Sequence, residues 1–480
     1  FFNLYNSYHF KREIKMKYHH EENILKKLIS RFLDMSQKGT VGFFEKTALL
    51  DLILFFENDD NVEKALEVCD IGIAQYGSSM EFLFHKSRLH VELENLDEAL
   101  VYLERALSYS PENFDLNLLQ AEVWIAYGEF KLAYNILKSL YQNSGNEEQS
   151  QVLFLLAKIH EINGDFKKMF SVLKKALQKD PNHPILLNKI WLAVEMAGLY
   201  EESVELHLAI IEDHPYSYLA WYNLGQAYFC LEDYETAAEA FEYSFIINSK
   251  FEIAYKDGAE SYIMAKNYEK ALNLYQEFLE ISSGDSDVFA KIGFCHEHMG
   301  EISIAKIHYS KSIEENASNS MALFRMGECH MFEEKWDDAI HYYNQAIEAD
   351  CNREEYLIAI AEAYFKNKNT KQARVFFQKA TDMAPELGKY WTQYATFLMK
   401  MGDSEEAFSI LDEAQIYTVD TELLYCKVAC LFAMSKREEA LKTLTLALEE
   451  NASLLESLFK LTPELEQDSE VRAVINLFMM

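Results

Sequence analysis

Few residues of this 480-residue chain have types and spacings that suit catalysis or metal binding. His296 and His298 are two apart, which on a helix directs their rings to different faces, whereas paired metal ligands need a separation of three or four. Cys426 and Cys430 are four apart, but no further ligands cluster with them. The sequence has no glycine-rich phosphate loop and no nucleophile elbow. We therefore predict no enzyme, no metal site and no cofactor.

A second group of residues suits binding. Between residues 188 and 325, amide, cationic and aromatic side chains return at two neighbouring positions of a 34-residue period. Asparagine can hydrogen-bond to a peptide backbone, and lysine and arginine can hold carboxylates. An extended segment of another protein is therefore the expected ligand. Eight residues form this predicted binding set: Asn188, Lys189, Tyr222, Asn223, Lys256, Lys291, Phe324 and Arg325.

Small residues mark the same period along most of the chain. Alanine recurs mainly every 34 residues, as at Ala237, Ala271 and Ala305, which indicates that one close helix approach is repeated. Glycine marks the turn between two helices, because it enters the left-handed region without steric cost. The period predicts an all-α stack of about twelve helix–turn–helix units. The turn glycines share one repeat position: Gly128, Gly164, Gly198, Gly300 and Gly402.

This pattern resembles the tetratricopeptide repeat, a helix–turn–helix unit of 34 residues. In the copy that begins at residue 218, Trp221, Leu224, Gly225 and Tyr228 precede Ala237 at the family's spacing. The resemblance implies a right-handed superhelical α-solenoid. It also implies that the first helix of each repeat faces an inner groove with its second, fifth, sixth and ninth positions, so the predicted binding set would lie in that groove.

Some tetratricopeptide proteins grip a terminal carboxylate with a clamp of lysine, asparagine and arginine residues. Lys256 and Arg325 occupy two of its places, but other residues, including Glu260, replace the asparagines, so chaperone-tail binding is not inferred. An alternative role for the groove cations is to pair with acids and neutralise a crowded surface. The acids in question are Glu195, Asp257, Glu260, Glu297 and Glu328.

Composition excludes several classes of partner. The chain has 78 acidic and 45 basic residues and a formal net charge of −33, whereas nucleic acids and anionic membranes attract basic surfaces. The acidity favours solubility of an elongated surface, or it steers basic partners. No stretch has the ~20 apolar residues that span a bilayer. The seven scattered cysteines predict mostly buried free thiols and a cytoplasmic location.

The repeats divide the chain into three parts. We expect a leader and an amphipathic helix in 1–45, the repeat array in 46–453 and capping helices in 454–480. The leader lacks the apolar core of a secretory signal, and Met16 is a candidate natural start that would make 1–15 an upstream extension. Near the other end, Val471, Val474, Ile475 and Phe478 form an apolar stripe that would cap the array or contact a partner.

These features predict a non-catalytic scaffold or adaptor that binds a partner segment in its groove. The alternative is a structural or assembly subunit, in homodimeric form, that acts through the end helices and the outer face. The overall plan, with Thr462-Pro463-Glu464-Leu465 near the end, is similar to long cytoplasmic tetratricopeptide proteins of Bacteroidota bacteria.

Overall fold

The computed structural model describes residues 22–38, 42–77 and 79–478, and these residues form helices joined by short connections, without a strand. The predicted all-α fold is therefore confirmed. The candidate start Met16 and the rest of 1–21 lie outside the described residues. The chain divides into two compact units, Phe1–Ala265 and Lys266–Met480. The boundary between them lies inside the predicted repeat array.

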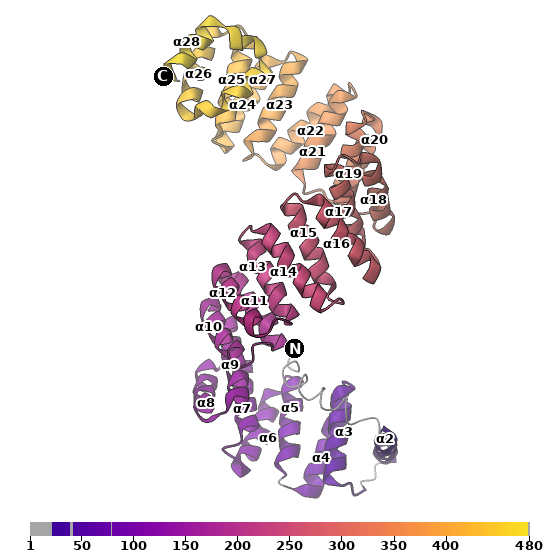
Figure 1. The fold of residues 1–480 in the computed structure, drawn as a ribbon. Coiled ribbons are helices and arrows are strands. Elements are labelled where there is room, and N and C mark those ends of the chain that lie inside the picture. Colours follow the sequence, from indigo (N-terminus) through magenta and orange to yellow (C-terminus); the bar gives the residue numbers. More distant parts are fainter. Residues whose placement is uncertain (1–21, 39–41, 78, 479–480) are drawn as a thin grey trace. The chain divides into compact units, whose positions relative to one another are not determined.

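In each unit the helices follow one another in chain order (Figure 1). The helices of the first unit are α2 (Glu22–Lys38), α3 (Lys46–Asn58), α4 (Val62–Tyr76), α5 (Met80–Glu92), α6 (Leu96–Tyr109), α7 (Phe114–Ala126), α8 (Phe130–Asn143), α9 (Asn146–Ile162), α10 (Phe166–Leu177), α11 (Pro184–Ala197), α12 (Tyr200–Asp213), α13 (Tyr218–Cys230), α14 (Tyr234–Ile247) and α15 (Glu252–Met264). Those of the second unit are α16 (Tyr268–Ile281), α17 (Ser286–His298), α18 (Ile302–Glu315), α19 (Ser320–Phe332), α20 (Trp336–Ala349), α21 (Glu354–Lys366), α22 (Thr370–Met383), α23 (Gly388–Met401), α24 (Ser404–Tyr417), α25 (Thr421–Ala433), α26 (Arg437–Asn451), η1 (Ala452–Leu454), α27 (Leu455–Leu461), η2 (Pro463–Gln467) and α28 (Ser469–Phe478).

A residue with positive φ ends the first helix of each repeat. The predicted turn glycines occupy this position with φ between 64° and 86°. In the remaining repeats a residue with a β-carbon occupies it, although that conformation costs roughly 1–2 kcal/mol outside glycine. The packing of the two helices therefore imposes the turn even where glycine is absent. The seven residues concerned are Asp60, Glu94, Glu232, Lys266, Glu334, Lys368 and Ser435.

The periodic small residues lie where each second helix meets its neighbours. All the alanines of the series are fully buried, and so are Met169 and Ser203, which interrupt it. First helices of successive repeats also pack against each other, as in the pairs α11–α13 and α23–α25, whereas the second helices of the array pack against each other less closely. The closer packing places the first helices on the inner side of each unit's curvature.

The ends of the array are closed by apolar contacts. In α2, Phe32 is 1% exposed and its ring packs against Phe44 and Phe56. In the second unit, α28 packs against α26 and buries Val471, while Leu477 is 79% exposed. Of the C-terminal stripe, Val471, Val474 and Ile475 thus pack on the last repeat, whereas Phe478 is 38% exposed.

Two other expectations concern the described residues. None of their helices has both the length and the apolar composition that crossing a membrane requires. Five cysteines are buried free thiols, as predicted, and Cys230 and Cys351 are exposed.

Candidate functional site

Lys189 of the predicted binding set already has an acidic partner within the chain. It lies on α11, and its Nζ is 2.6 Å from Oε1 of Glu161 on α9. The exposed fractions of the two side chains are 32% and 26%. The ion pair connects the first helices of two successive repeats, so it contributes to the interface between these repeats.

Tyr222 and Asn223 are also engaged inside the first unit. Asn223 is 2% exposed, and its side-chain amide donates to the carbonyl oxygen of Leu187 at 2.7 Å. Tyr222 is 8% exposed, and its hydroxyl donates to Oδ2 of Asp257 at 2.6 Å. Burial, together with this hydrogen bond, raises the pKa of the Tyr222 hydroxyl. Both side chains therefore connect repeats and offer little surface to a ligand.

Phe324 and Arg325 lie on α19 in the second unit. Arg325 donates from Nη1 to Oε1 of Glu297 at 3.4 Å, and its guanidinium carbon is 4.9 Å from the ring centroid of Phe294. Phe324 stacks on Tyr356, with ring centroids 4.6 Å apart. Arg325 is thus paired with one of the groove acids, Glu297.

The other members of the predicted binding set differ in exposure. Asn188 is exposed on α11, and Lys256 and Lys291 are half-buried on α15 and α17. The set is divided between the two units, with Lys291, Phe324 and Arg325 in the second. Each unit therefore presents its own part of the predicted binding set.

Replacement of Lys189 is expected to change stability. Lys189→Met and Glu161→Gln should each destabilise the joint between α9 and α11, with a coupling energy of about 0.5–1 kcal/mol because the pair is only partly buried. Hydrogen exchange of α9 and α11 in the two single variants and the double variant measures this coupling. Strictly additive effects would contradict it.

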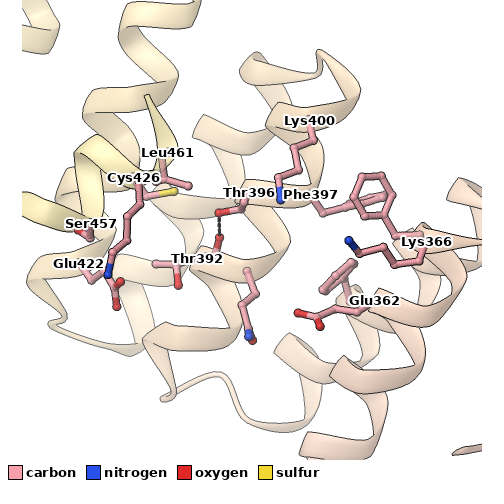
Figure 2. A pocket seen from close by; sticks show the side chains of 14 residues that line it. Glu362, Lys366, Thr392, Thr396, Phe397, Lys400, Glu422, Cys426, Ser457 and Leu461 are labelled. Carbon is pink, nitrogen blue, oxygen red and sulfur yellow. Dashed lines mark hydrogen bonds between the residues drawn. The ribbon is translucent and has the colours of Figure 1, made fainter. Parts of the chain in front are cut away.

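A cavity of about 450 Å³ lies on the face of the first helices in the second unit (Figure 2). Its walls come from α21, α23, α25 and α27, with one residue from α22. The apolar part of the lining is formed by Phe365, Phe377, Phe397, Cys426 and Leu461. The polar part is formed by Glu362, Lys366, Thr392, Gln393, Thr396, Lys400, Glu422, Ser457 and Lys460.

The lysines of this cavity differ from Lys189 and Arg325 in their surroundings. Across the described ranges, neither Lys366 nor Lys400 has a carboxylate oxygen within 4.0 Å of its amine, and both side chains are exposed. Figure 2 shows their amines directed toward the space that Glu362 also faces. Their donors are therefore available to a ligand.

Glu362 is an acidic residue of the same cavity and interacts electrostatically with these lysines. Burial raises the pKa of the Glu362 carboxyl, and the negative charge of Glu328 raises it by a smaller amount. The positive charges of Lys400 and Lys366 lower it. On α23, Thr396 donates its hydroxyl to the backbone carbonyl oxygen of Thr392 at 2.7 Å, which orients the Thr396 side chain at the cavity wall. The site offers cations, hydroxyls and two carboxylates around an apolar base.

None of the cavity residues belongs to the predicted binding set, which ends at Arg325. Two signals in the sequence point to them. Lys366 and Lys400 are 34 residues apart and so hold the same repeat position. Thr392, Gln393 and Thr396 hold the fifth, sixth and ninth positions of the copy that begins at 388, the positions expected to face the groove.

The histidines singled out for chemistry do not converge. Nδ1 of His296 is 2.6 Å from Oε2 of Glu301, whereas His298 stacks on Tyr268, with ring centroids 4.9 Å apart. In the part of the chain that the structure describes, no three His, Cys, Asp or Glu side chains gather as a metal ion requires.

Comparison with protein families identifies the repeats. Three sequence models described as tetratricopeptide repeat match this chain. One matches residues 90–159, the second matches 193–245 and 309–387, and the third matches 150–183. The matched ranges fall in both units.

Relatives of known sequence are similar over part of their length. The TPR repeat-containing protein MJ1428 of Methanocaldococcus jannaschii is 21% identical over 321 residues, which are 62% of this chain and 54% of that protein. The anaphase-promoting complex subunit cut9 of Schizosaccharomyces pombe is 23% identical over 188 residues, which are 38% of this chain and 27% of that protein. The chain thus spans about half of the first relative and about a quarter of the second.

Solved structures are similar to this chain with low TM-scores. The APC/C hetero-tetramer Cut9–Hcn1 has a TM-score of 0.38 and 13% identity, covering 91% of this chain and 84% of that one. YrrB, described as a TPR protein with an unusual peptide-binding site, has a TM-score of 0.32 and 19% identity, covering 39% of this chain and 96% of that one.

Proposed function

Because this chain is a tetratricopeptide repeat protein, we propose that it is a non-catalytic scaffold that binds a segment of another protein on the face of its first helices. Proteins of this repeat class generally act as scaffolds, since stacked repeats present an extended inner surface. We place this scaffold in the cytoplasm because its cysteines are free thiols in the described residues.

The cavity of the second unit is the observation that carries the proposal. It opens on the face of the first helices, and successive repeats supply its polar groups: Glu362 and Lys366 from α21, and Gln393 and Lys400 from α23. Residues at one repeat position line up along such a stack, so a ligand that contacts one repeat also meets the next. A volume of about 450 Å³ is within the usual range for ligand sites.

Site-specific photo-cross-linking tests this proposal. A photoreactive phenylalanine analogue replaces Gln393, which is exposed at the cavity, and in a matched control it replaces Gln372, which is exposed on α22 outside the cavity. We expect cross-links to a distinct protein in native cells from position 393 and none of that protein from position 372. The same protein at equal yield from both positions would contradict the proposal.

A further inference from the structure

The cavity of the second unit has a charge balance opposite to that of the whole chain. Its lining contains Lys366, Lys400 and Lys460 but only two acids, Glu362 and Glu422, whereas the chain carries a net charge of −33. Neither Lys366 nor Lys400 would have to give up an ion pair to bind a carboxylate, because neither has one among the described residues. The cavity therefore attracts a short anionic segment, while the acidic chain around it repels a long polyanion.

The base of the cavity requires an apolar ligand group as well. The ring centroid of Phe397 is 5.2 Å from that of Phe365 and 5.0 Å from that of Phe377. Phe377 and Phe397 are each 2% exposed, so they fix the base. The apolar surface open to a ligand comes from the half-buried Phe365 and Leu461. A small inorganic anion would leave the apolar lining in contact with water. A large apolar side chain would cover it and gain the free energy of burial.

The polar groups of the lining include both donors and acceptors. Gln393 and Ser457 can do either, the lysines donate, and Glu362 and Glu422 accept when ionised. A peptide backbone presents N–H donors next to C=O acceptors and satisfies both kinds. An isolated anion would satisfy only the donors.

We infer that this cavity binds an internal acidic segment of the partner protein, with a large apolar side chain over Phe365 and flanking carboxylates on Lys366 and Lys400. The inference rests on the proposed function and names the chemistry of its ligand. The carboxylates come from side chains, so a free C-terminus is not required.

A doubly capped peptide tests this ligand chemistry. The probe is acetyl-Asp-Asp-Phe-Asp-Asp-amide with a fluorescent label, and its affinity for the full chain is measured by fluorescence anisotropy at low and high salt. The double variant Lys366→Ala/Lys400→Ala is expected to bind about tenfold more weakly than the wild type. The control Lys371→Ala/Lys436→Ala removes the same charge from two exposed lysines outside the cavity and should bind as the wild type does.

Two altered probes separate the ionic and apolar contributions. Replacing Phe by Ala, or every Asp by Asn, should each weaken binding about tenfold. Inorganic phosphate should compete only weakly, because it leaves the apolar base uncovered. Equal affinity of the two lysine variants, or a probe whose affinity survives both replacements, would overturn the acidic-segment inference.

Photo-cross-linking at Gln393 distinguishes this failure from failure of the scaffold proposal. A partner that still cross-links from position 393 in the Lys366→Ala/Lys400→Ala background, through a segment without acidic residues, overturns the inference and leaves the scaffold intact. If no partner cross-links from position 393 and the probe does not bind, both the inference and the scaffold proposal are overturned. A cross-linked segment that contains a large apolar residue between acids supports both.

Discussion

Acidification from pH 7 to pH 5 is expected to lower the free energy of unfolding around α12 by about 2 kcal/mol through one side chain, His207. The side chain is fully buried, and burial lowers its pKa to about 4, although its hydrogen bond to the carbonyl oxygen of Ser203 acts in the opposite direction. Nδ1 is 2.7 Å from that oxygen, and the amide of Asn223 lies 3.2 Å from Nε2. Because the amide donates to Nε2, the proton of the neutral ring is on Nδ1.

The direction of this pH effect follows from the pKa of His207 in the unfolded and in the folded chain. In the unfolded chain the imidazole has its ordinary pKa of 6.5, so between pH 6.5 and pH 4 the unfolded state binds a proton that the folded state does not. Stability is complete above pH 6.5 and falls as the pH drops toward 4. The total loss from His207 is about 3 kcal/mol below pH 4.

The variant His207→Gln isolates this effect, because glutamine does not titrate. Hydrogen exchange of α11, α12 and α13 at several pH values, corrected for the intrinsic exchange rate, should show a steeper loss of protection in the wild type than in the variant. Contributions from other titrating groups are common to both proteins and cancel. An identical pH dependence in the two proteins would contradict the buried neutral state of His207.

Gly327→Ala is expected to destabilise the second unit by about 2 kcal/mol, although alanine is the better helix former. A β-carbon on Gly327 would lie 2.5 Å from Cε1 of Tyr343, a distance that real structures do not tolerate. Tyr343 is fully buried and donates its hydroxyl to Glu328, so its ring has little freedom to move. Overpacking costs typically 1–3 kcal/mol, or more where the neighbour is fixed, which exceeds the gain of roughly 1 kcal/mol in helix propensity.

Two controls identify the cause. Gly300→Ala meets nothing within 4 Å of the new β-carbon but keeps a φ of 80°, so only the conformational cost of about 1–2 kcal/mol is expected. In a Tyr343→Leu background, Gly327→Ala should cost less than in the wild type, because the obstructing ring is gone. Hydrogen-exchange protection of α19 and α20 measures each step, and equal costs in both backgrounds would exclude the clash as the cause.

Local patterns were sufficient to predict the repeated fold. Ala305 and Ala339 are fully buried because every repeat brings its second helix equally close to its neighbours. The turns at Gly300 and Gly402 also follow from the residue type. The same turn at Glu334 has no such local signal, because there the packing of two helices overrides the cost of a β-carbon.

The candidate site was less predictable than the fold. The resemblance to the tetratricopeptide repeat implied that the first helices line the inner face, and the predicted binding set taken from that face included Lys189 and omitted Lys366. Lys189 lies 2.6 Å from a carboxylate of the preceding repeat, whereas Lys366 has none within 4.0 Å among the described residues. Asn223 resembles a ligand donor in sequence, and only its contact with Leu187 shows that it connects two repeats.

The sequence by itself therefore determined the period, the helix pairs and the turns at glycine, because these depend on residues within one repeat and its immediate neighbours. The resemblance to the tetratricopeptide repeat implied which face the first helices line. Only the tertiary structure decided which polar groups on that face are already paired. It also decided that Phe377 of α22 and Lys460 of α27 line one cavity, although 83 residues separate them in the chain. Pairing and cavity shape depend on distances between side chains of different helices, and a repeat pattern does not contain those distances.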